Sequence, residues 1–212
     1  MLKTKIYIFS VIIFTILIFG CTDDSEENIV LPSLKPYDLK IIKGWLSFQD
    51  QAYEDAVMFF HEAKEIDPLN STSHIGLGWG YAMTGQMEKS ISSFQSAIER
   101  DSGSTASYSG KAFVYLAQRN YKKAISNGYQ AVLLGGENYS FQHLPQVNYR
   151  NLRLLMAESY YALGQYDKAQ NQIDIIDPEN DLDPNKSDYV EKMILKIENL
   201  GLNDPILTQL TG

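Results

Sequence analysis

The sequence repeats itself at an interval of 34 residues, and this period limits the folds open to the chain. In three successive copies a small residue recurs and a large aromatic residue follows it directly. Further columns of small residues recur later in each copy. The clearest columns are Gly44, Gly78 and Ala112; Trp45, Trp79 and Phe113; Ala56, Ser90 and Ala124; and Ala63, Ala97 and Ala131. A fixed period of this length predicts one supersecondary unit stacked several times.

Each copy is expected to fold as two short amphipathic helices. Helices of this length are marginal alone, so each pair must bury its apolar stripes on itself and on the next pair. The turn between the helices falls on Gly85 in copy two and on Gly164 in a fourth copy. Glycine takes a positive φ there without steric cost. Gln51 and Arg119 hold the same place in copies one and three.

These columns resemble the tetratricopeptide repeat, in which Ala, Phe, Ala and Pro follow at fixed intervals in and after the second helix. Copy one shows them as Ala56, Phe60, Ala63 and Pro68. The resemblance implies an all-α fold, a right-handed α-solenoid of helix-turn-helix pairs. The copies are expected at 37–70, 71–104, 105–138 and 150–183, so that the solenoid covers 37–183 with an insertion at 139–149.

Two further segments are assigned by their helix signals. Pro145, inside the insertion, is expected to start a lengthened first helix of the fourth copy. Residues 188–200 show the apolar and charged pattern of an amphipathic helix, and Gly201 closes it. This helix lies in 184–212 and is expected to cap the open end of the solenoid.

The N-terminus predicts export. Lys3 and Lys5 precede an uncharged, mostly apolar stretch at 6–20, which is the pattern of a secretory signal at 1–20. Leu17–Cys21 resembles the lipobox of bacterial lipoproteins, although Phe19 is larger than the residue usual at its place. The resemblance implies cleavage before Cys21 and attachment of acyl chains such as palmitate to it. An uncleaved membrane anchor is the alternative.

Residues 21–36 are expected to form an acidic, lipidated tether. The acidic run at 22–28 within it is either a solvated spacer or a surface-export signal of the kind found in some Gram-negative lipoproteins. The predicted location is therefore the bacterial cell envelope, through a lipid anchor at Cys21. The outer membrane is favoured, and the facing of the domain, periplasmic or surface, stays open.

In this repeat family the first helices line a concave inner face, and the residue after the small one points into it. Aromatic residues there would capture a protein or peptide segment. The candidate groove residues are Ile41, Trp45, Phe48, Ile75, Trp79, Phe113, Leu116, Glu158 and Tyr161. The glycines at 76, 78 and 80 are interpreted as keeping the faces of Trp79 open. Alternatively, the rings form core, or the tether fills the groove.

The leading hypothesis is a lipid-anchored envelope scaffold that mediates protein–protein interaction, for example in envelope assembly. The alternative is a glycan or small-ligand binder that uses Trp45 and Trp79 as stacking platforms. A third possibility is that the repeats only form oligomers. Nucleic acid is not an expected partner, because the net charge is -8 and no long basic stretch occurs.

No sequence motif indicates an enzyme, a metal or a cofactor. His61 and Glu62 begin a run similar to the zinc motif H-E-x-x-H, but the second histidine is missing. A solvated face is the expected place for that pair, and His74 and His143 are expected at the surface. No phosphate-binding loop, nucleophile elbow or cysteine pair is present in the sequence.

Overall fold

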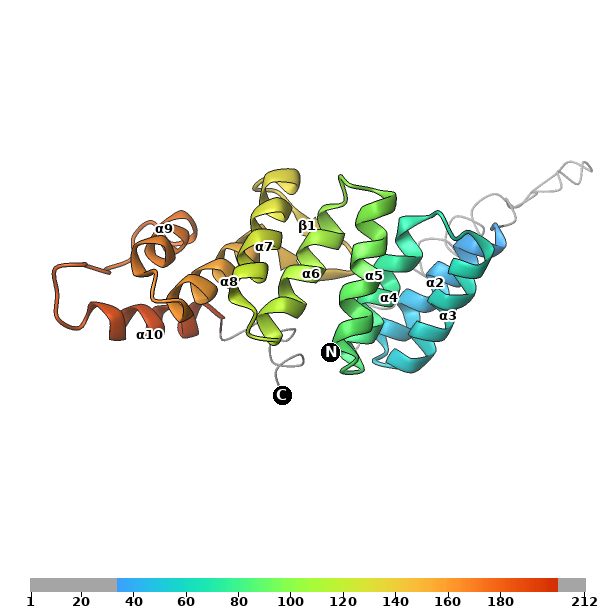
Figure 1. Cartoon of the computed structure of the whole chain (residues 1–212), viewed down its shortest axis with the longest axis horizontal. Coiled ribbons are helices and arrows are strands. Elements are labelled where there is room, and N and C mark those ends of the chain that lie inside the picture. Colours follow the sequence, from blue (N-terminus) through green and yellow to red (C-terminus); the bar gives the residue numbers. More distant parts are fainter. Residues whose placement is uncertain (1–33, 202–212) are drawn as a thin grey trace, which may run out of the picture. The chain divides into compact units, whose positions relative to one another are not determined.

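A computed structural model describes residues 34–201, so that the predicted signal peptide, Cys21 and the tether up to residue 33 lie outside the described residues. Helix pairs follow one another side by side along the described chain, each packed on the next (Figure 1). The helices are α2 (Pro36–Gln49), α3 (Tyr53–Ile66), α4 (Ser71–Met83), α5 (Met87–Arg100), α6 (Thr105–Ala117), α7 (Tyr121–Gly135), α8 (Tyr149–Ala162), α9 (Tyr166–Ile176) and α10 (Tyr189–Gly201). The predicted α-solenoid is confirmed.

The first helix of each pair ends in the same turn. After α4, the Gln86 N–H donates to the Tyr81 carbonyl at 2.8 Å, and Gly85 between them has a φ of 74°. This is the Schellman arrangement, which satisfies carbonyls left over at the helix end. Gln51 and Arg119 take φ values of 63° and 57° at the corresponding places, as their register predicts. Residues other than glycine are strained there by about 1–2 kcal/mol.

In α3 and in α5, the second helices of the first two pairs, one phenylalanine ring lies between two glycines. A Cβ atom placed on Gly44 of α2 or on Gly76 of α4 would come within 2.5 Å of the Phe60 ring of α3. The next copy repeats this packing, with Phe94 between Gly78 and Gly110. The missing side chains therefore let three helices close around one buried ring, at the density usual for protein interiors.

This packing corrects the interpretation of the glycines around Trp79. Gly76 and Gly78 make room for the phenylalanines of the second helices, and Gly80 makes room for Val57. Trp79 itself is 0% exposed, so no face of its indole is left open.

The insertion forms a β-hairpin. Strands β1 (Ser140–Phe141) and β2 (Leu144–Asn148) are antiparallel, with Ser140 opposite Asn148 and Phe141 opposite Leu144. Pro145 lies inside β2, and α8 begins at Tyr149, so the prediction that Pro145 starts the helix is wrong. Asn148 takes the N-cap instead, because its side chain accepts a hydrogen bond from the Asn151 N–H at 3.0 Å.

The buried side chains form two clusters that meet at α8. The larger cluster contains residues of the helices from α2 through α8 and of the hairpin. The smaller one joins α8, α9 and α10 around Ile173, Met193 and Ile197. Helix α10 thus covers the C-terminal end of the helix array, as predicted. Between residues 34 and 201, no helix combines the length and the apolar character needed to span a bilayer.

Candidate partner-binding site

Seven of the nine candidate groove residues meet in the larger cluster. These are Ile41, Trp45, Phe48, Ile75, Trp79, Phe113 and Leu116. All except the half-buried Ile41 are buried, and Trp45 and Trp79 are 3% and 0% exposed. Tyr161 lies apart from them, because it packs on the smaller cluster with its ring 5.5 Å from Tyr166. Glu158 is half-buried on α8.

The hairpin covers the aromatic residues of the first helices. The Phe141 ring stands edge-on to Trp45, with ring centroids 5.6 Å apart, and lies nearly parallel to Trp79 at 6.5 Å. Val147, on the other strand, is fully buried in the same cluster. Of the two alternatives to an open groove, the structure shows core, and it is the insertion that completes this core.

His143 adds a second ring at the tip of the hairpin. Its imidazole stacks on Trp45 with centroids 4.1 Å apart and planes 2° from parallel. The Gln142 amide donates a hydrogen bond to the His143 Nε2 atom at 2.8 Å. Only a neutral imidazole has a ring nitrogen that can accept this bond. Burial lowers the pKa of His143, which favours that neutral form. The imidazole is half-buried at the tip of the hairpin, where it lines the surface and packs on Trp45.

Tyr139 fixes the start of the hairpin to α6. Its hydroxyl lies 2.9 Å from the Ser109 hydroxyl, and its ring packs on the larger cluster. Burial raises the pKa of Tyr139 to about 12, so the phenol stays neutral and able to donate across the physiological pH range.

The docked hairpin leaves two polar atoms of the face unpaired. The indole nitrogens of Trp45 and Trp79 are buried, and neither donates to an acceptor among residues 34–201. A buried donor without a partner costs about 1–3 kcal/mol. The hairpin therefore fills the aromatic face by ring contact and shape, and a segment that offered carbonyl oxygens there would gain these two hydrogen bonds.

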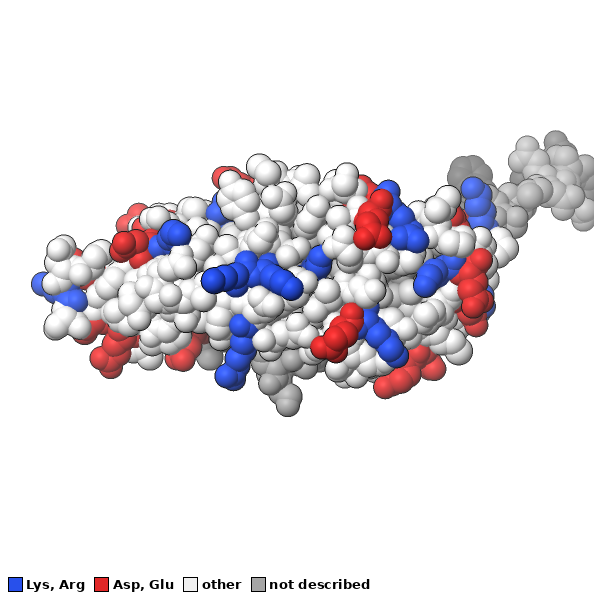
Figure 2. Space-filling view, viewed as in Figure 1, with Lys and Arg blue, Asp and Glu red and all other residues white. Residues whose placement is uncertain are grey.

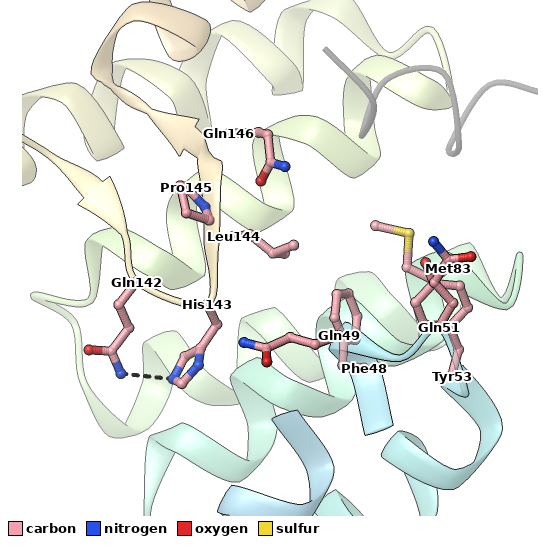
Figure 3. A pocket seen from close by; sticks show the side chains of 10 residues that line it. All are labelled: Phe48, Gln49, Gln51, Tyr53, Met83, Gln142, His143, Leu144, Pro145 and Gln146. Carbon is pink, nitrogen blue, oxygen red and sulfur yellow. Dashed lines mark hydrogen bonds between the residues drawn. The ribbon is translucent and has the colours of Figure 1, made fainter. Parts of the chain in front are cut away.

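A pocket of about 400 Å³ opens beside the hairpin, where β2 faces the ends of α2 and α4 and the start of α3. Figure 3 shows Phe48, Tyr53 and Met83 on one side and the hairpin on the other. The remaining lining is mostly amide: Gln49, Gln51, Gln142 and Gln146, together with His143, Leu144 and Pro145. No charged side chain lines it. Gln49, the last residue of α2, lies at this rim.

The other histidines are engaged in packing. His61 Nε2 lies 2.6 Å from the Tyr81 hydroxyl, so the pair His61–Glu62 is not a simple solvated face. His74 is 3% exposed and its Nε2 lies 3.3 Å from the Pro68 carbonyl, so its predicted surface position is wrong. Among residues 34–201, no group of histidine, cysteine and acidic side chains could hold a metal ion.

Charges of both signs are interspersed over the face seen in Figure 2. Several lysines lean over aromatic rings, as Lys111 and Lys123 do over Tyr115, at 5.9 and 5.2 Å from its centroid. Burial is the main cause that lowers the pKa of Lys111, and the nearby Lys123 adds to it. This distribution is that of a mixed surface without a continuous basic track.

Sequence reasoning missed the hairpin as part of the site. A signal was present, since Tyr139, Phe141 and His143 alternate with polar residues in the pattern of a strand. Because Pro145 was interpreted as the start of a helix, the strand pattern just before it was not recognised. The three alternating side chains are the ones that contact α6 and the two tryptophans.

Comparisons with known proteins agree with this architecture. No protein-family model matches the chain. The DnaJ homolog subfamily C member 7 homolog of Dictyostelium discoideum is 26% identical over 147 residues, which cover 67% of this chain. The chain spans only about a quarter of that protein's length, 27%.

Two solved structures extend the comparison. YrrB, a TPR protein with an unusual peptide-binding site, is 16% identical, with a TM-score of 0.57 over 80% of this chain and 88% of its own. A tetratricopeptide repeat protein from Parabacteroides merdae is 17% identical, with a TM-score of 0.57 over 82% of this chain and 63% of its own. At these identities the likeness concerns architecture, and it shows that the chain has the tetratricopeptide-repeat fold.

Proposed function

We propose that the protein is a scaffold that binds an extended, uncharged segment of a partner protein in the pocket beside the hairpin. The lining of this pocket carries the proposal, since it combines rings and amides and has no charged side chain. The aromatic face formed by Trp45 and Trp79 already holds one extended segment, the hairpin. The fold supports the same function, because a protein of similar fold, YrrB, has a peptide-binding site.

The chemistry of the lining indicates the kind of segment. Glutamine amides both donate and accept, so Gln49, Gln51 and Gln142 can hydrogen-bond to the backbone of an extended peptide. The Tyr53 ring and the flexible thioether of Met83 would contact its apolar side chains. An acidic tail would find no cation in the lining, so a neutral segment with apolar or aromatic side chains fits best.

In-cell crosslinking tests this site. A photoreactive residue placed at the exposed positions Gln49 and Gln142 would face the pocket, whereas Trp79 is too buried to report on a partner. Asp101, exposed between α5 and α6, is the matched control position. We expect one discrete crosslinked protein from both pocket positions and none from the control. Crosslinks only within the chain, or the same products from all three positions, would refute the pocket assignment.

The glycan alternative loses its platforms while the hairpin is docked, because neither Trp45 nor Trp79 has a free face. Titration with a glycan panel still separates the two classes of ligand. A saturable change in tryptophan emission with one sugar, and no change with peptides from the crosslinked partner, would favour the glycan-binding hypothesis.

We propose in addition that Cys21 carries a lipid anchor that holds this scaffold on a membrane of the bacterial envelope, with the outer membrane favoured. The proposal rests on the signal pattern of residues 1–20 and on the lipobox resemblance at Leu17–Cys21. Stable anchoring needs two or more acyl chains. Cells fed an alkyne-bearing fatty acid should label the protein, and Cys21→Ser should abolish the label. A labelled Cys21→Ser protein, or an unlabelled wild type, would contradict the anchor.

A further inference from the structure

Helix α2 presents an apolar stripe to solvent. Leu39, Ile42 and Leu46 are 39%, 42% and 54% exposed. Their spacing of three and four residues places them on one face of the helix. Charged side chains flank the stripe, with Lys35 near its N-terminal end and Asp50 near its C-terminal end.

The repeat register shows what this face does elsewhere in the chain. The residues 34 positions later are Ser73, Gly76 and Gly80 of α4, followed by Ser107, Gly110 and Val114 of α6, and all six are buried. A Cβ atom on Gly76 would come within 2.5 Å of Phe60 in α3, and one on Gly110 within 2.3 Å of Phe94 in α5. In both later copies this face is therefore the contact with the preceding helix pair.

In α2 the same face has no preceding pair among residues 34–201, and its side chains are large. The small residues of α4 and α6 accommodate a phenylalanine from the helix before them. Leucine and isoleucine at the same positions leave no room for such a ring, so they fit a helix surface that carries no protruding aromatic side chain. The opposite end of the array is closed by α10, which removes the complementary surface that a head-to-tail stack would need.

We propose that the stripe of α2 packs on the α2 stripe of a second copy of this chain, with the two helices antiparallel about a two-fold axis. One register brings the apolar side chains together and places opposite charges beside each other. It places Leu39 on the partner's Leu46, and Lys35 beside the partner's Asp50, because each charged residue lies four positions outside its leucine. Such an isologous contact closes on itself and forms a dimer. The stripe residues Leu39, Ile42 and Leu46 do not line the partner pocket.

The dimer is expected to be weak, because three apolar side chains per copy make a contact below the size of stable interfaces. Sedimentation equilibrium of the full chain in density-matched detergent should show dimers at concentrations of about 10–100 μM. Leu46→Lys should weaken dimerisation by at least about tenfold, with unchanged helical circular dichroism. Leu133→Lys, at a position 66% exposed on α7, is the matched control and should dimerise as the wild type does.

The register has its own test. In a Cys21→Ser background, copies with Leu39→Cys mixed with copies with Leu46→Cys should form a disulfide. Copies with Leu39→Cys alone should not, because their thiols would be about 10 Å apart along the axis, beyond disulfide reach. A full chain that is monomeric throughout would overturn the proposal, even if its own N-terminal segment covered the stripe. A dimer that survives Leu46→Lys would overturn it equally.

Discussion

Replacing Phe141 with alanine tests whether the hairpin holds both tryptophans out of water. Phe141 is 9% exposed and contacts Trp45, Trp79 and His143 through its ring. Without the ring, the hairpin loses its largest buried group and the indoles lose their cover. We expect the helix pairs to remain folded while the hairpin detaches or loosens.

The size of the effect follows from the packing. Truncation of a buried phenylalanine costs about 3–5 kcal/mol. Phe141 belongs at the lower end, about 3 kcal/mol, because its neighbours Ser140 and Gln142 are exposed and the strand can relax. For a domain of this size each kcal/mol lowers Tm by roughly 2–4 °C, so we expect a decrease of roughly 6–12 °C.

The assay is direct, because Trp45 and Trp79 are the only two tryptophans of the sequence. Their emission should shift to the red and become accessible to acrylamide in Phe141→Ala, while far-UV circular dichroism keeps its helical form. Tyr129→Ala, at a position 56% exposed on α7, is the control and should change stability by less than about 0.5 kcal/mol. Wild-type emission together with wild-type Tm in Phe141→Ala would refute the reasoning.

Three further outcomes are expected. Arg119→Gly should raise the free energy of unfolding by about 1 kcal/mol in urea, since it relieves a φ of 57°; Gln118→Gly, with a φ of -77°, should give no gain, and equal effects would contradict the strain. Gly76→Ala should destabilise by about 1–3 kcal/mol, because its Cβ would overlap Phe60; an unchanged urea midpoint would mean that the ring moves aside freely. Because burial lowers the pKa of His143, its contribution to stability is complete above about pH 6.5 and is lost as the pH falls through the lowered value. Acidification to about pH 5 should therefore expose the tryptophans in the wild type more than in His143→Gln; equal exposure would mean that protonation of His143 does not loosen the hairpin.

The solenoid could be predicted from the sequence because its contacts are local and repeated. Gly85 and Arg119 lie 34 residues apart at the equivalent turn of two copies, so the two copies support the same assignment. Helix pairing then follows from a period that no single helix could establish. Even the departures in the pattern, such as Gln51, lie where the register places them.

The site could be predicted only in part. The register grouped Trp45 and Trp79, which do share one cluster, but their exposure depends on a segment more than 60 residues away from either ring. Such a contact leaves no periodic trace, because the insertion occurs once. A stripe of rings at helical spacing is the same pattern whether it meets solvent, a partner or the chain's own hairpin.

The hairpin also changes how a partner would compete for the aromatic face. Since β1 and β2 are joined covalently to α7 and α8, dilution does not remove this occupant, which acts at an effective concentration on the order of millimolar. If about 99 of 100 molecules hold it docked, any ligand that needs the tryptophans binds about 100-fold more weakly than its intrinsic affinity. The face then discriminates by affinity as well as by shape, and apolar segments present well below about 100 times their intrinsic Kd leave it closed.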